Sequence, residues 1–448
     1  MDKYHILHYT FGLPPKATGG LPIYVRDLSD AQKDAGYKVS ILLPKQKLHG
    51  KDKISKKGNI YYLENSLPVS SIFGMKQPVD FMRKYNTSAV EKFLDRLSPN
   101  VIHIHSLMGL PKEFLEVAHS KQIKIIFTTH DYYGLCLKCN FVDFRGNICT
   151  DINCERCAKC NLINGISTKM SYMISSTLYK LLKQNTVLKN FKTKYRDKMV
   201  EDGLNVNEVD LNLEYEQIKN YSDLMEYYKS MFHLIDFFHF NSELTKEMYL
   251  SYLPNIKGEV IPITLSSIKD HRNQINQSQS EVVRIGYIGR KEPYKGINVL
   301  INVLEKLDKE NANFLCLLYG DDFSSYDSLL NGKIKNMGVY QNKYIEKVFN
   351  SIDVLVIPSI CKETYGFIGL EALSYGIPVL FSENIGSKDL IKGCSSDYVF
   401  KNDELYNILS KTIENSEFLY NYRKIINEKL ILRTMKEHAV DILNIYRN

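Results

Sequence analysis

Residues 357–386, with the sequence IPSICKETYGFIGLEALSYGIPVLFSENIG, decide the fold of this chain. The segment just before them, 352–357 (IDVLVI), is short and rich in β-branched residues, which is typical of a buried parallel strand, and Pro358 closes it. A helix is predicted to begin near Tyr365 and to stop at Gly376, because helices commonly end at a glycine. The pattern therefore predicts a strand, a loop and a helix, the repeating unit of a parallel α/β sheet.

Two glutamates flank the start of this helix, with Glu363 on the loop and Glu371 on the helix. Within a single helix their spacing would leave them roughly 80° apart, so only the loop position lets both carboxylates converge. The first N–H groups of the helix, from Tyr365, Gly366 and Phe367, can bind a phosphate. A carboxylate one turn inside the helix can bind ribose hydroxyls, and one on the loop can reach beyond the phosphate. We therefore expect a nucleoside diphosphate joined to a hydroxylated group as ligand.

Together with the strand and the YGF and GIPV sequences, the spacing from Glu363 to Glu371 resembles the signature of the family 4 retaining glycosyltransferases of the GT-B fold. The resemblance covers nearly the whole chain and is strongest in its second half. It implies an α/β protein of two Rossmann-like parallel-sheet domains that face a cleft, with a helical insertion in the first domain. A surface pair of acids at an ordinary strand-to-helix turn is the alternative.

The overall composition is that of a soluble globular protein of two or three domains, with 448 residues, 44% apolar and 24% charged. No apolar run approaches the roughly eighteen residues that a membrane span needs, and the opening residues MDKY do not form a signal peptide. We therefore expect a cytoplasmic protein. A net charge of +7 is small for this length and does not indicate nucleic-acid binding.

The chain is predicted to divide into four parts. Residues 1–265 form the first domain, to which the resemblance assigns the acceptor, and residues 282–420 form the second, which binds the nucleotide sugar. Residues 266–281 are polar and read as the linker. Residues 421–448 have a helical period, and relatives return such a helix to the first domain.

A glycine pair, Gly19 and Gly20, follows the first predicted strand and precedes a helix. These glycines permit close approach of the backbone to a charged ligand, and in the family this loop meets the donor diphosphate. Plain turn glycines are the alternative.

His130 and Asp131 follow the predicted strand 123–129, at the end where ligands of parallel sheets bind. By resemblance, FTTHD aligns with the family's histidine beside the donor sugar, so His130 is the first active-site candidate in this half. A histidine that is merely hydrogen-bonded is the alternative. His103 and His105 alternate on one strand and share a face, with His103 interpreted as a core residue and His105 as facing the site.

Cysteines are concentrated in the loop 136–160. The pairs Cys136/Cys139 and Cys157/Cys160 have the spacing of a structural four-thiolate zinc site, and Cys149 and Cys154 are left over. Other quartets fit as well, and free buried cysteines are a further alternative. Four thiolates leave no open coordination position, so such a zinc would clamp the loop. The resemblance implies catalysis without an obligatory metal.

An insertion at 162–236 carries a candidate basic amphipathic helix, whose apolar positions are Met170, Ile174, Leu178, Leu181 and Leu182. Such a helix could lie on anionic lipid at the inner face of the membrane, which would suit a lipid-linked acceptor. A helix packed on the domain with a solvated basic face explains the pattern equally well.

In the second domain, residues 289–296 (GRKEPYKG) place Arg290 and Lys295 on a glycine-bounded loop after a strand. Two such cations can bracket a diphosphate from two sides. In the family, this sequence pattern neutralises the departing diphosphate, and the neighbourhood of Tyr340 holds the nucleobase through backbone groups. Solvated loop cations are the alternative.

The sequence predicts a retaining glycosyltransferase that moves a sugar from a UDP- or GDP-sugar to a glycan or lipid-linked acceptor, in surface polysaccharide or capsule biosynthesis. By resemblance, Glu363 holds the donor sugar, Glu371 the ribose, and His130 the sugar near the reacting carbon. Charge developing on the leaving diphosphate would be stabilised by Arg290, Lys295 and the helix N-terminus. A nucleotide-sugar epimerase of the same fold and a non-catalytic zinc-binding scaffold are the alternatives.

Overall fold

The computed structural model describes residues 4–175, 213–272, 282–391 and 396–447, apart from 48–49, 71–72 and 328. The chain divides into two compact units. The first comprises Met1–Asn241, Thr245–Ile261 and Met435–Asn448, and the second comprises Ser242–Leu244 and Pro262–Thr434. The chain thus leaves the first unit, forms the second, and returns to the first.

The described part of the first unit is built on an eight-stranded sheet in the order β3-β4-β2-β1-β5-β6-β7-β8. Neighbouring strands are parallel except β3 and β4, which are antiparallel. The strands are β1 (His5–Tyr9), β2 (Lys38–Lys45), β3 (Lys53–Lys57), β4 (Ile60–Glu64), β5 (Val101–Ile104), β6 (Lys124–Thr128), β7 (Phe237–Phe240) and β8 (Gly258–Val260).

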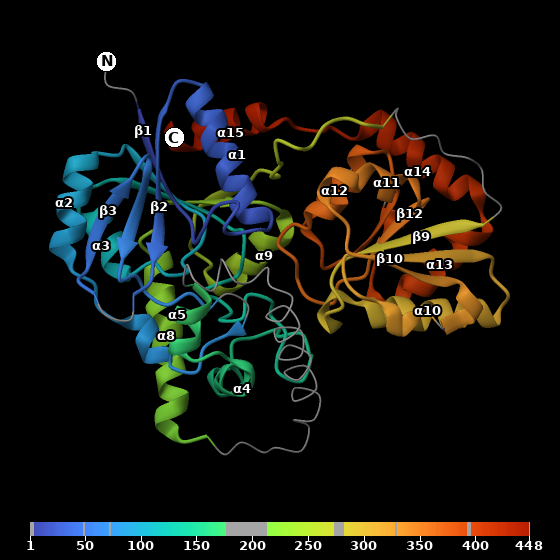
Figure 1. Cartoon of the computed structure of the whole chain (residues 1–448), viewed down its shortest axis with the longest axis horizontal. Coiled ribbons are helices and arrows are strands. Elements are labelled where there is room, and N and C mark those ends of the chain that lie inside the picture. Colours follow the sequence, from blue (N-terminus) through green and yellow to red (C-terminus); the bar gives the residue numbers. More distant parts are fainter. Residues whose placement is uncertain are drawn as a thin grey trace. The chain divides into compact units, whose positions relative to one another are not determined.

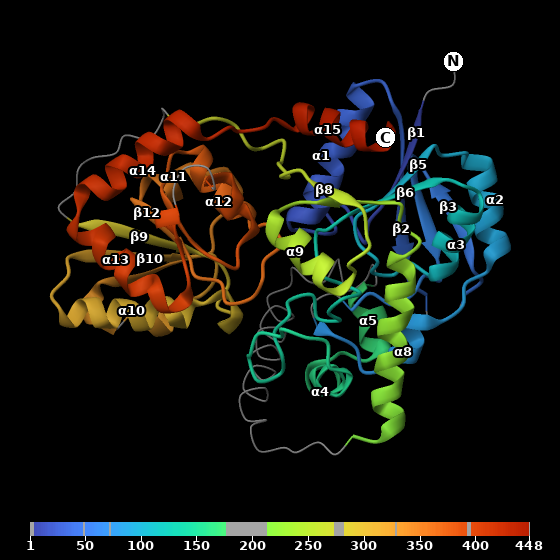
Figure 2. The same cartoon turned by 180° about the vertical axis from the view of Figure 1, so that it is seen from behind.

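The helices of the first unit follow the order expected of parallel crossovers. They are α1 (Gly20–Asp34), α2 (Thr87–Leu97), α3 (Lys112–Ser120), α4 (Cys154–Asn164), α5 (Thr168–Ser175), α8 (Tyr215–Phe232), α9 (Glu243–Tyr252) and α15 (Met435–Arg447). In α2 the side chain of Asn86 accepts a hydrogen bond from the N–H of Ala89, and the apolar residues Val90, Phe93, Leu94 and Leu97 are buried at helical spacing. Figures 1 and 2 both show α15 beside α1.

The second unit has a six-stranded, wholly parallel sheet in the order β11-β10-β9-β12-β13-β14 within the described residues. Its strands are β9 (Val283–Ile288), β10 (Phe314–Tyr319), β11 (Ile334–Gly338), β12 (Val354–Ile357), β13 (Val379–Ser382) and β14 (Val399–Phe400). Its helices are α10 (Ile297–Lys309), α11 (Ile345–Asn350), α12 (Phe367–Ser374), α13 (Leu405–Glu414) and α14 (Ser416–Lys429). Helix α10 lies on one side of the sheet, and α11, α12 and α14 lie on the other (Figures 1 and 2).

The strand order of each sheet reverses at one strand. In the first unit β1 lies between β2 and β5, and in the second unit β9 lies between β10 and β12. Ligands of open parallel sheets bind at such a reversal, beyond the carboxyl ends of the strands. The loops after β1, β5, β9 and β12 are therefore where functional side chains are expected.

The predicted strand and helix around residue 357 are present as β12 and α12, and Gly376, with φ of 74°, follows the helix as expected. The segment that returns to the first unit begins at Met435 rather than at 421, because α14 packs in the second unit. Of the predicted linker 266–281, residues 266–272 belong to the second unit, where the N–H of His271 donates to the carbonyl of Ser374 at 2.8 Å. Residues 273–281 lie outside the described part.

The predicted insertion contains α5 and α8 and part of α4. Of the predicted basic amphipathic helix, Met170 and Ile174 belong to α5, whereas Leu178, Leu181 and Leu182 lie outside the described residues. Across the described ranges, every helix is too short or too polar to pass through a lipid bilayer.

Candidate functional site

In the second unit, Lys295 and Glu363 meet at the point where the strand order reverses. Lys295 ends the short 3-10 turn Pro293–Lys295 that follows β9, and Glu363 lies on the loop after the neighbouring strand β12. The Nζ atom of Lys295 lies 3.0 Å from Oε1 of Glu363. Two residues predicted separately from the sequence are therefore joined in one ion pair.

Gly296 allows these two loops to press together. Its φ is 78°, and a Cβ atom there would lie 1.7 Å from the carbonyl oxygen of Pro358. The carbonyl of Tyr294 accepts hydrogen bonds from the N–H groups of Ile360, at 2.9 Å, and Cys361, at 3.1 Å. Only glycine has both the conformation and the space required at this position.

The surroundings of the ion pair keep both groups in place. Burial lowers the pKa of Lys295, but Glu363, Cys361 and Glu292 together outweigh this effect, so the pKa is raised and the ammonium stays charged. The hydroxyl of Ser359 donates to Oε1 of Glu363, and the N–H of Glu363 donates to the carbonyl of Asn384 at 2.8 Å. The pair is thus a fixed charged feature at the carboxyl end of the sheet.

Arg290 lies on the same loop as Lys295 but is more exposed. Its side chain is 66% exposed, and its guanidinium lies 3.7 Å from a carboxylate oxygen of Glu292. The carbonyl of Arg290 accepts a hydrogen bond from the hydroxyl of Tyr287 at 2.9 Å, which fixes the main chain. Arg290 therefore has an anchored backbone and a side chain that can reach a ligand.

The start of α12 differs slightly from the prediction. The helix begins at Phe367, and Gly366, with φ of 83°, is its N-cap. The first N–H groups of a helix have no acceptor within it, so those of Phe367 and Ile368 are the ones available to an anion. Tyr365 lies before the helix, with a buried ring whose hydroxyl has no hydrogen-bond partner among the described residues.

Glu371 and Tyr340, both predicted to bind the nucleoside, lie close enough for the carboxylate of Glu371 to raise the pKa of Tyr340. Burial raises the pKa of Glu371 to about 7. Burial raises the pKa of Tyr340 to about 12, and the carboxylate of Glu371 adds to this shift. A carboxyl group that is half protonated at neutral pH is unusual outside functional sites.

In the first unit, the glycine pair forms the start of α1 as predicted. Gly19 is the N-cap, with φ of 120°, and Gly20 is the first helical residue. One turn further on, the ring of Tyr24 packs edge-on against His130, with 4.7 Å between the ring centroids. Tyr24 is not among the residues predicted from the sequence, although its position one turn after the glycines could have indicated it.

His130 follows β6 after one intervening residue. Its Nε2 lies 3.2 Å from Nδ1 of His105. Burial, together with neighbouring histidines, holds the pKa values of both rings well below the usual value, so both are neutral at pH 7. His103 and His105 are both fully buried, and Nδ1 of His105 contacts His130.

Asp131, next to His130, has an unusual environment. Burial raises its pKa to about 6, opposed by hydrogen bonds from the N–H of Tyr133 and the hydroxyl of Ser106. These two donors lie 2.9 Å and 3.0 Å from the carboxylate oxygens. The carboxyl group therefore fixes the turn that follows β6.

Several cysteines of the loop lie close enough to one another to affect each other's pKa. Burial raises the pKa of Cys157 to about 12, and the thiols of Cys136, Cys160, Cys149 and Cys154 contribute in that order. Cys160, whose pKa is also raised to about 12 by burial, is affected by Cys136 and Cys149 as well. Cys139 lies beside Asp131 and Cys136. Cys136 is thus a common neighbour of Cys139, Cys149, Cys157 and Cys160.

Four cysteine thiols are the right donor set for a structural zinc. They are gathered more loosely than a bound ion requires, because within the described ranges the group whose ligand atoms all lie within 4.8 Å of one another is His8, His103 and His105. No disulfide joins the cysteines that the structure describes. The predicted zinc site at Cys136, Cys139, Cys157 and Cys160 therefore stays a prediction.

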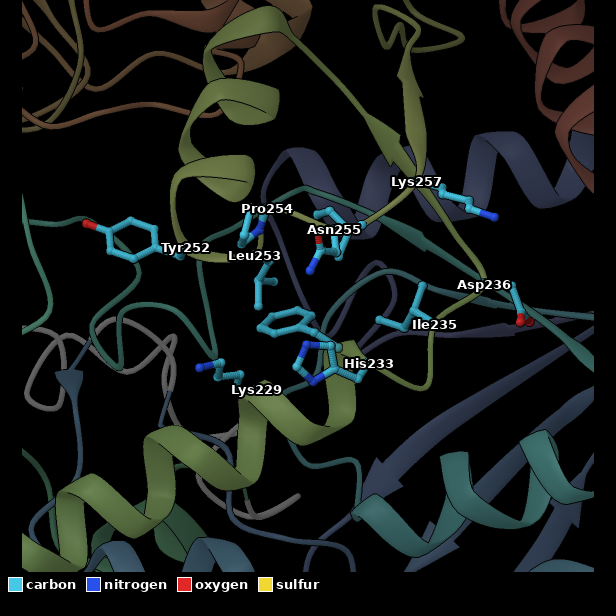
Figure 3. A pocket seen from close by; sticks show the side chains of 11 residues that line it. Lys229, His233, Ile235, Asp236, Tyr252, Leu253, Pro254, Asn255 and Lys257 are labelled. Atoms are coloured by element: carbon cyan, nitrogen blue, oxygen red, sulfur yellow. The ribbon is translucent and has the colours of Figure 1, made fainter.

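A hollow of about 470 Å³ in the first unit contains none of the predicted site residues. Asp236 and Lys257 lie on one side of it and Tyr252 on the other, with His233 between them (Figure 3). Asp236 and Lys257 directly precede β7 and β8, so the hollow lies at the amino ends of these strands. Since parallel sheets bind ligands at the carboxyl ends, we assign it no catalytic role.

Comparison with known proteins finds one family match in each unit. Residues 268–429 match the family model described as Glycosyl transferases group 1, and residues 18–144 match Glycosyltransferase Family 4. The first match contains Arg290, Lys295, Glu363 and Glu371, and the second contains the glycine pair and His130.

Three curated relatives illustrate the similarity. An uncharacterized glycosyltransferase of Methanocaldococcus jannaschii is 32% identical over 120 residues, which are 25% of this chain and 30% of the relative. The glycogen synthase of Clostridium beijerinckii is 27% identical over 197 residues, 39% of each chain. The lipopolysaccharide 1,2-N-acetylglucosaminetransferase of Salmonella typhimurium is 21% identical over 201 residues, 39% of this chain and 52% of the relative. The chain therefore spans between 30% and 52% of the length of these relatives.

Solved structures match over the full length. The sucrose-phosphate synthase of Thermosynechococcus elongatus has a TM-score of 0.56 at 15% identity, covering 99% of this chain and 98% of that one. The Anabaena protein HepE in complex with UDP has a TM-score of 0.52 at 13% identity, covering 99% of each chain. These likenesses show the fold, which is GT-B, with two Rossmann-like parallel-sheet units.

Proposed function

We infer a function from the premise that this chain belongs to the group 1 and family 4 glycosyltransferases and has the GT-B fold. The inferred function is transfer of a sugar from a nucleoside diphosphate sugar to a glycan or lipid-linked acceptor. The observation that carries this proposal is the ion pair between Lys295 and Glu363 at the reversal of the second sheet. A cation and a carboxylate fixed side by side suit a ligand that carries a diphosphate next to a hydroxylated ring.

In the proposed complex, the second unit binds the donor. The diphosphate contacts Lys295, Arg290 and the first N–H groups of α12, which together supply positive charge where the leaving group becomes more negative. Glu363 accepts hydrogen bonds from hydroxyls of the donor sugar, and Glu371 accepts them from the ribose. That HepE was solved with UDP supports a nucleotide ligand for this fold.

The first unit contributes His130 and the glycine loop to the same reaction. His130 is neutral and lies at the carboxyl end of β6, where it can hydrogen-bond a sugar hydroxyl near the reacting carbon. The main chain at Gly19 and Gly20 approaches the diphosphate. The acceptor hydroxyl attacks from the face that the diphosphate leaves, so the anomeric configuration is retained. None of these steps requires a metal ion.

We further propose a setting in surface polysaccharide biosynthesis, in the cytoplasm and at the inner face of the membrane when the acceptor is lipid-linked. The Salmonella relative, named for its transfer to lipopolysaccharide, supports this setting. The segment proposed to contact anionic lipid lies mostly outside the described residues.

The proposal is tested in two steps. Thermal unfolding in the presence of a panel of UDP-, GDP- and ADP-sugars identifies the donor, because a ligand that binds the folded state raises the unfolding temperature. NMR of the product formed with that donor and a glycan acceptor then reports the anomeric configuration. Inversion of that configuration would contradict the retaining mechanism. Full activity of the Arg290→Ala, Lys295→Ala double variant would contradict the assignment of the diphosphate site.

Two alternatives give different results in the same experiments. An epimerase converts the donor to an isomer when no acceptor is present, which NMR of donor incubated alone detects. A zinc-binding scaffold binds metal but shows no shift with any nucleotide sugar. The intact Lys295–Glu363 pair favours the transferase over the scaffold.

A further inference from the structure

Five histidines of the first unit belong to one continuous series of hydrogen bonds. They lie on β1 (His8), on and just after β5 (His103, His105), after β6 (His130) and on β7 (His239). All except His130 are 0% exposed. Burial lowers the pKa of His8 and His239 to about 4 and those of the other three well below the usual value, so all five rings are neutral. A neutral imidazole has one N–H and one acceptor nitrogen.

One end of the series is fixed by a carbonyl group. Nε2 of His239 lies 2.8 Å from the carbonyl oxygen of Ile261, which can only accept, so the proton of His239 is on Nε2. Nδ1 of His239 is then an acceptor, and the hydroxyl of Thr128, at 2.8 Å, must donate to it. The Thr128 oxygen in turn accepts from Nε2 of His103, at 2.6 Å.

The series continues through a tyrosine of the returning helix α15. Since His103 carries its proton on Nε2, its Nδ1 accepts from the hydroxyl of Tyr446, at 2.6 Å. The Tyr446 oxygen then accepts from the amide nitrogen of Gln32, at 3.1 Å. This fixes the orientation of the amide, so Oε1 of Gln32 faces His8.

The last three hydrogen bonds lead to His130. In each of them, as in the bonds above, the donor lies on the His130 side and the acceptor on the Ile261 side. Nε2 of His8 donates to Oε1 of Gln32, at 2.7 Å, and Nδ1 of His8 accepts from Nε2 of His105, at 2.9 Å. Nδ1 of His105, at 3.2 Å, then accepts from Nε2 of His130. The opposite direction would require the Ile261 carbonyl to donate a proton that it does not have.

We propose that this series of hydrogen bonds holds His130 in the tautomer with its proton on Nε2, so that Nδ1 acts as a hydrogen-bond acceptor. Gln32 and Tyr446 are then positioning residues, because they set the direction of the series without reaching the reacting atoms. The consequence for the substrate rests on the proposed function: a sugar hydroxyl donates to Nδ1 of His130, and does not accept from it.

A metal ion is the other reading of this cluster, since ligand atoms of His8, His103 and His105 lie within 4.8 Å of one another. Both ring nitrogens of each of these three residues already have a hydrogen-bond partner. A metal would have to displace those partners, whereas the hydrogen-bonded series satisfies every one of these six nitrogens. The geometry therefore favours the series.

The proposal is tested first on the unmodified protein. Long-range proton–nitrogen NMR spectra of the protein labelled with ¹⁵N-histidine distinguish the two neutral tautomers, and single His→Gln variants assign the signals. We expect the Nε2–H tautomer for His8, His103, His105, His130 and His239 alike. An Nδ1–H signal from His130 would overturn the proposal, and so would loss of the signals on adding Co²⁺, which would indicate a metal site.

A variant tests the direction of the series. In Tyr446→Phe the hydroxyl that orients Gln32 is absent, so the amide can turn over and both directions become available to His8, His105 and His130. We expect the single His130 tautomer to become a mixture. The control is Tyr4→Phe, which removes a hydroxyl that hydrogen-bonds the main-chain carbonyl of Tyr446, at 3.2 Å, but takes no part in the series. A single unchanged tautomer in Tyr446→Phe would overturn the role of Tyr446.

The outcome is separable from that of the proposed function. The tautomer is measured without any nucleotide sugar, so it can be confirmed even when no donor binds. If the tautomer is as proposed but deoxy analogues of the identified donor are all used as well as the donor itself, the role of His130 toward the sugar fails and the hydrogen-bonded series stands. If donor binding is found and the tautomer is wrong, only this inference fails.

Discussion

The ammonium nitrogen of Lys295 lies 3.0 Å from a carboxylate oxygen of Glu363, across the loops that follow two neighbouring strands. The pair brings together the cation proposed for the diphosphate and the carboxylate proposed for the sugar. Each residue therefore also fixes the position of the other. Changing one is expected to alter both diphosphate stabilisation and sugar orientation.

Lys295→Ala should lower kcat for sugar transfer by about 10²–10³-fold, the usual effect of removing one group that stabilises developing charge. The measurement is steady-state kinetics with the donor identified by thermal shift. Lys309→Ala is the control, since Lys309 is an exposed lysine at the far end of α10. Equal kcat values for the two variants would remove Lys295 from the mechanism.

Donor affinity should depend on the protonation of Glu371, whose pKa is raised to about 7 by burial. Ribose hydroxyls donate to the carboxylate form, so affinity should fall as the pH drops below about 7, by up to about tenfold per pH unit. Calorimetric titration of the nucleoside diphosphate at several pH values measures this. In Glu371→Gln the affinity should be lower and its pH dependence should be lost. A profile that is the same in both proteins would show that another group titrates.

Zinc content should identify the ligands in the cysteine loop. We expect about one zinc per chain in the purified protein. Cys136→Ser, Cys139→Ser, Cys157→Ser and Cys160→Ser should each lose it, whereas Cys149→Ser and Cys154→Ser should retain it. Metal analysis by atomic emission gives the result. Retention by Cys139→Ser with loss by Cys149→Ser would contradict the spacing-based quartet.

Gly296→Ala should lower the free energy of unfolding of the second unit by more than the cost of placing alanine at a positive φ. A positive φ costs alanine about 1–2 kcal/mol, and the clash of its Cβ with the Pro358 carbonyl should add about 1–3 kcal/mol. Gly332→Ala is the matched control, because Gly332 has φ of 83° and its added Cβ would meet no described atom within 4 Å. Urea unfolding of both variants measures the difference. Equal losses of unfolding free energy in the two variants would mean that the loops of Gly296 and Pro358 can move apart at no energetic cost.

Patterns within short stretches of the sequence were enough to predict the fold and the positions of most site residues. The apolar run before Pro358 and the glycine after α12 define β12 and α12 from neighbouring residues alone. The spacing of Glu363 and Glu371 placed one on the loop and one on the helix, as found. These features were predictable because each depends on residues close together in the sequence.

What sequence reasoning missed depends on contacts between distant residues. Nothing near Lys295 indicates that Glu363 is its partner, because β9 and β12 become neighbours only in the sheet. Tyr24 and Tyr446 lie in separate helices and meet the histidines only once α1 and α15 are packed on the sheet.

The return of α15 to the first unit has a consequence for biosynthesis. During translation, the residues of the second unit leave the ribosome before α15 does. The sheet of the first unit therefore lacks α15 while the second unit is being synthesised. The face of α1 that α15 covers is uncovered during that interval, and Tyr24 lies on this face, with its hydroxyl 2.8 Å from His438 of α15. The nascent enzyme therefore acquires its complete first unit late, after elongation has passed residue 434.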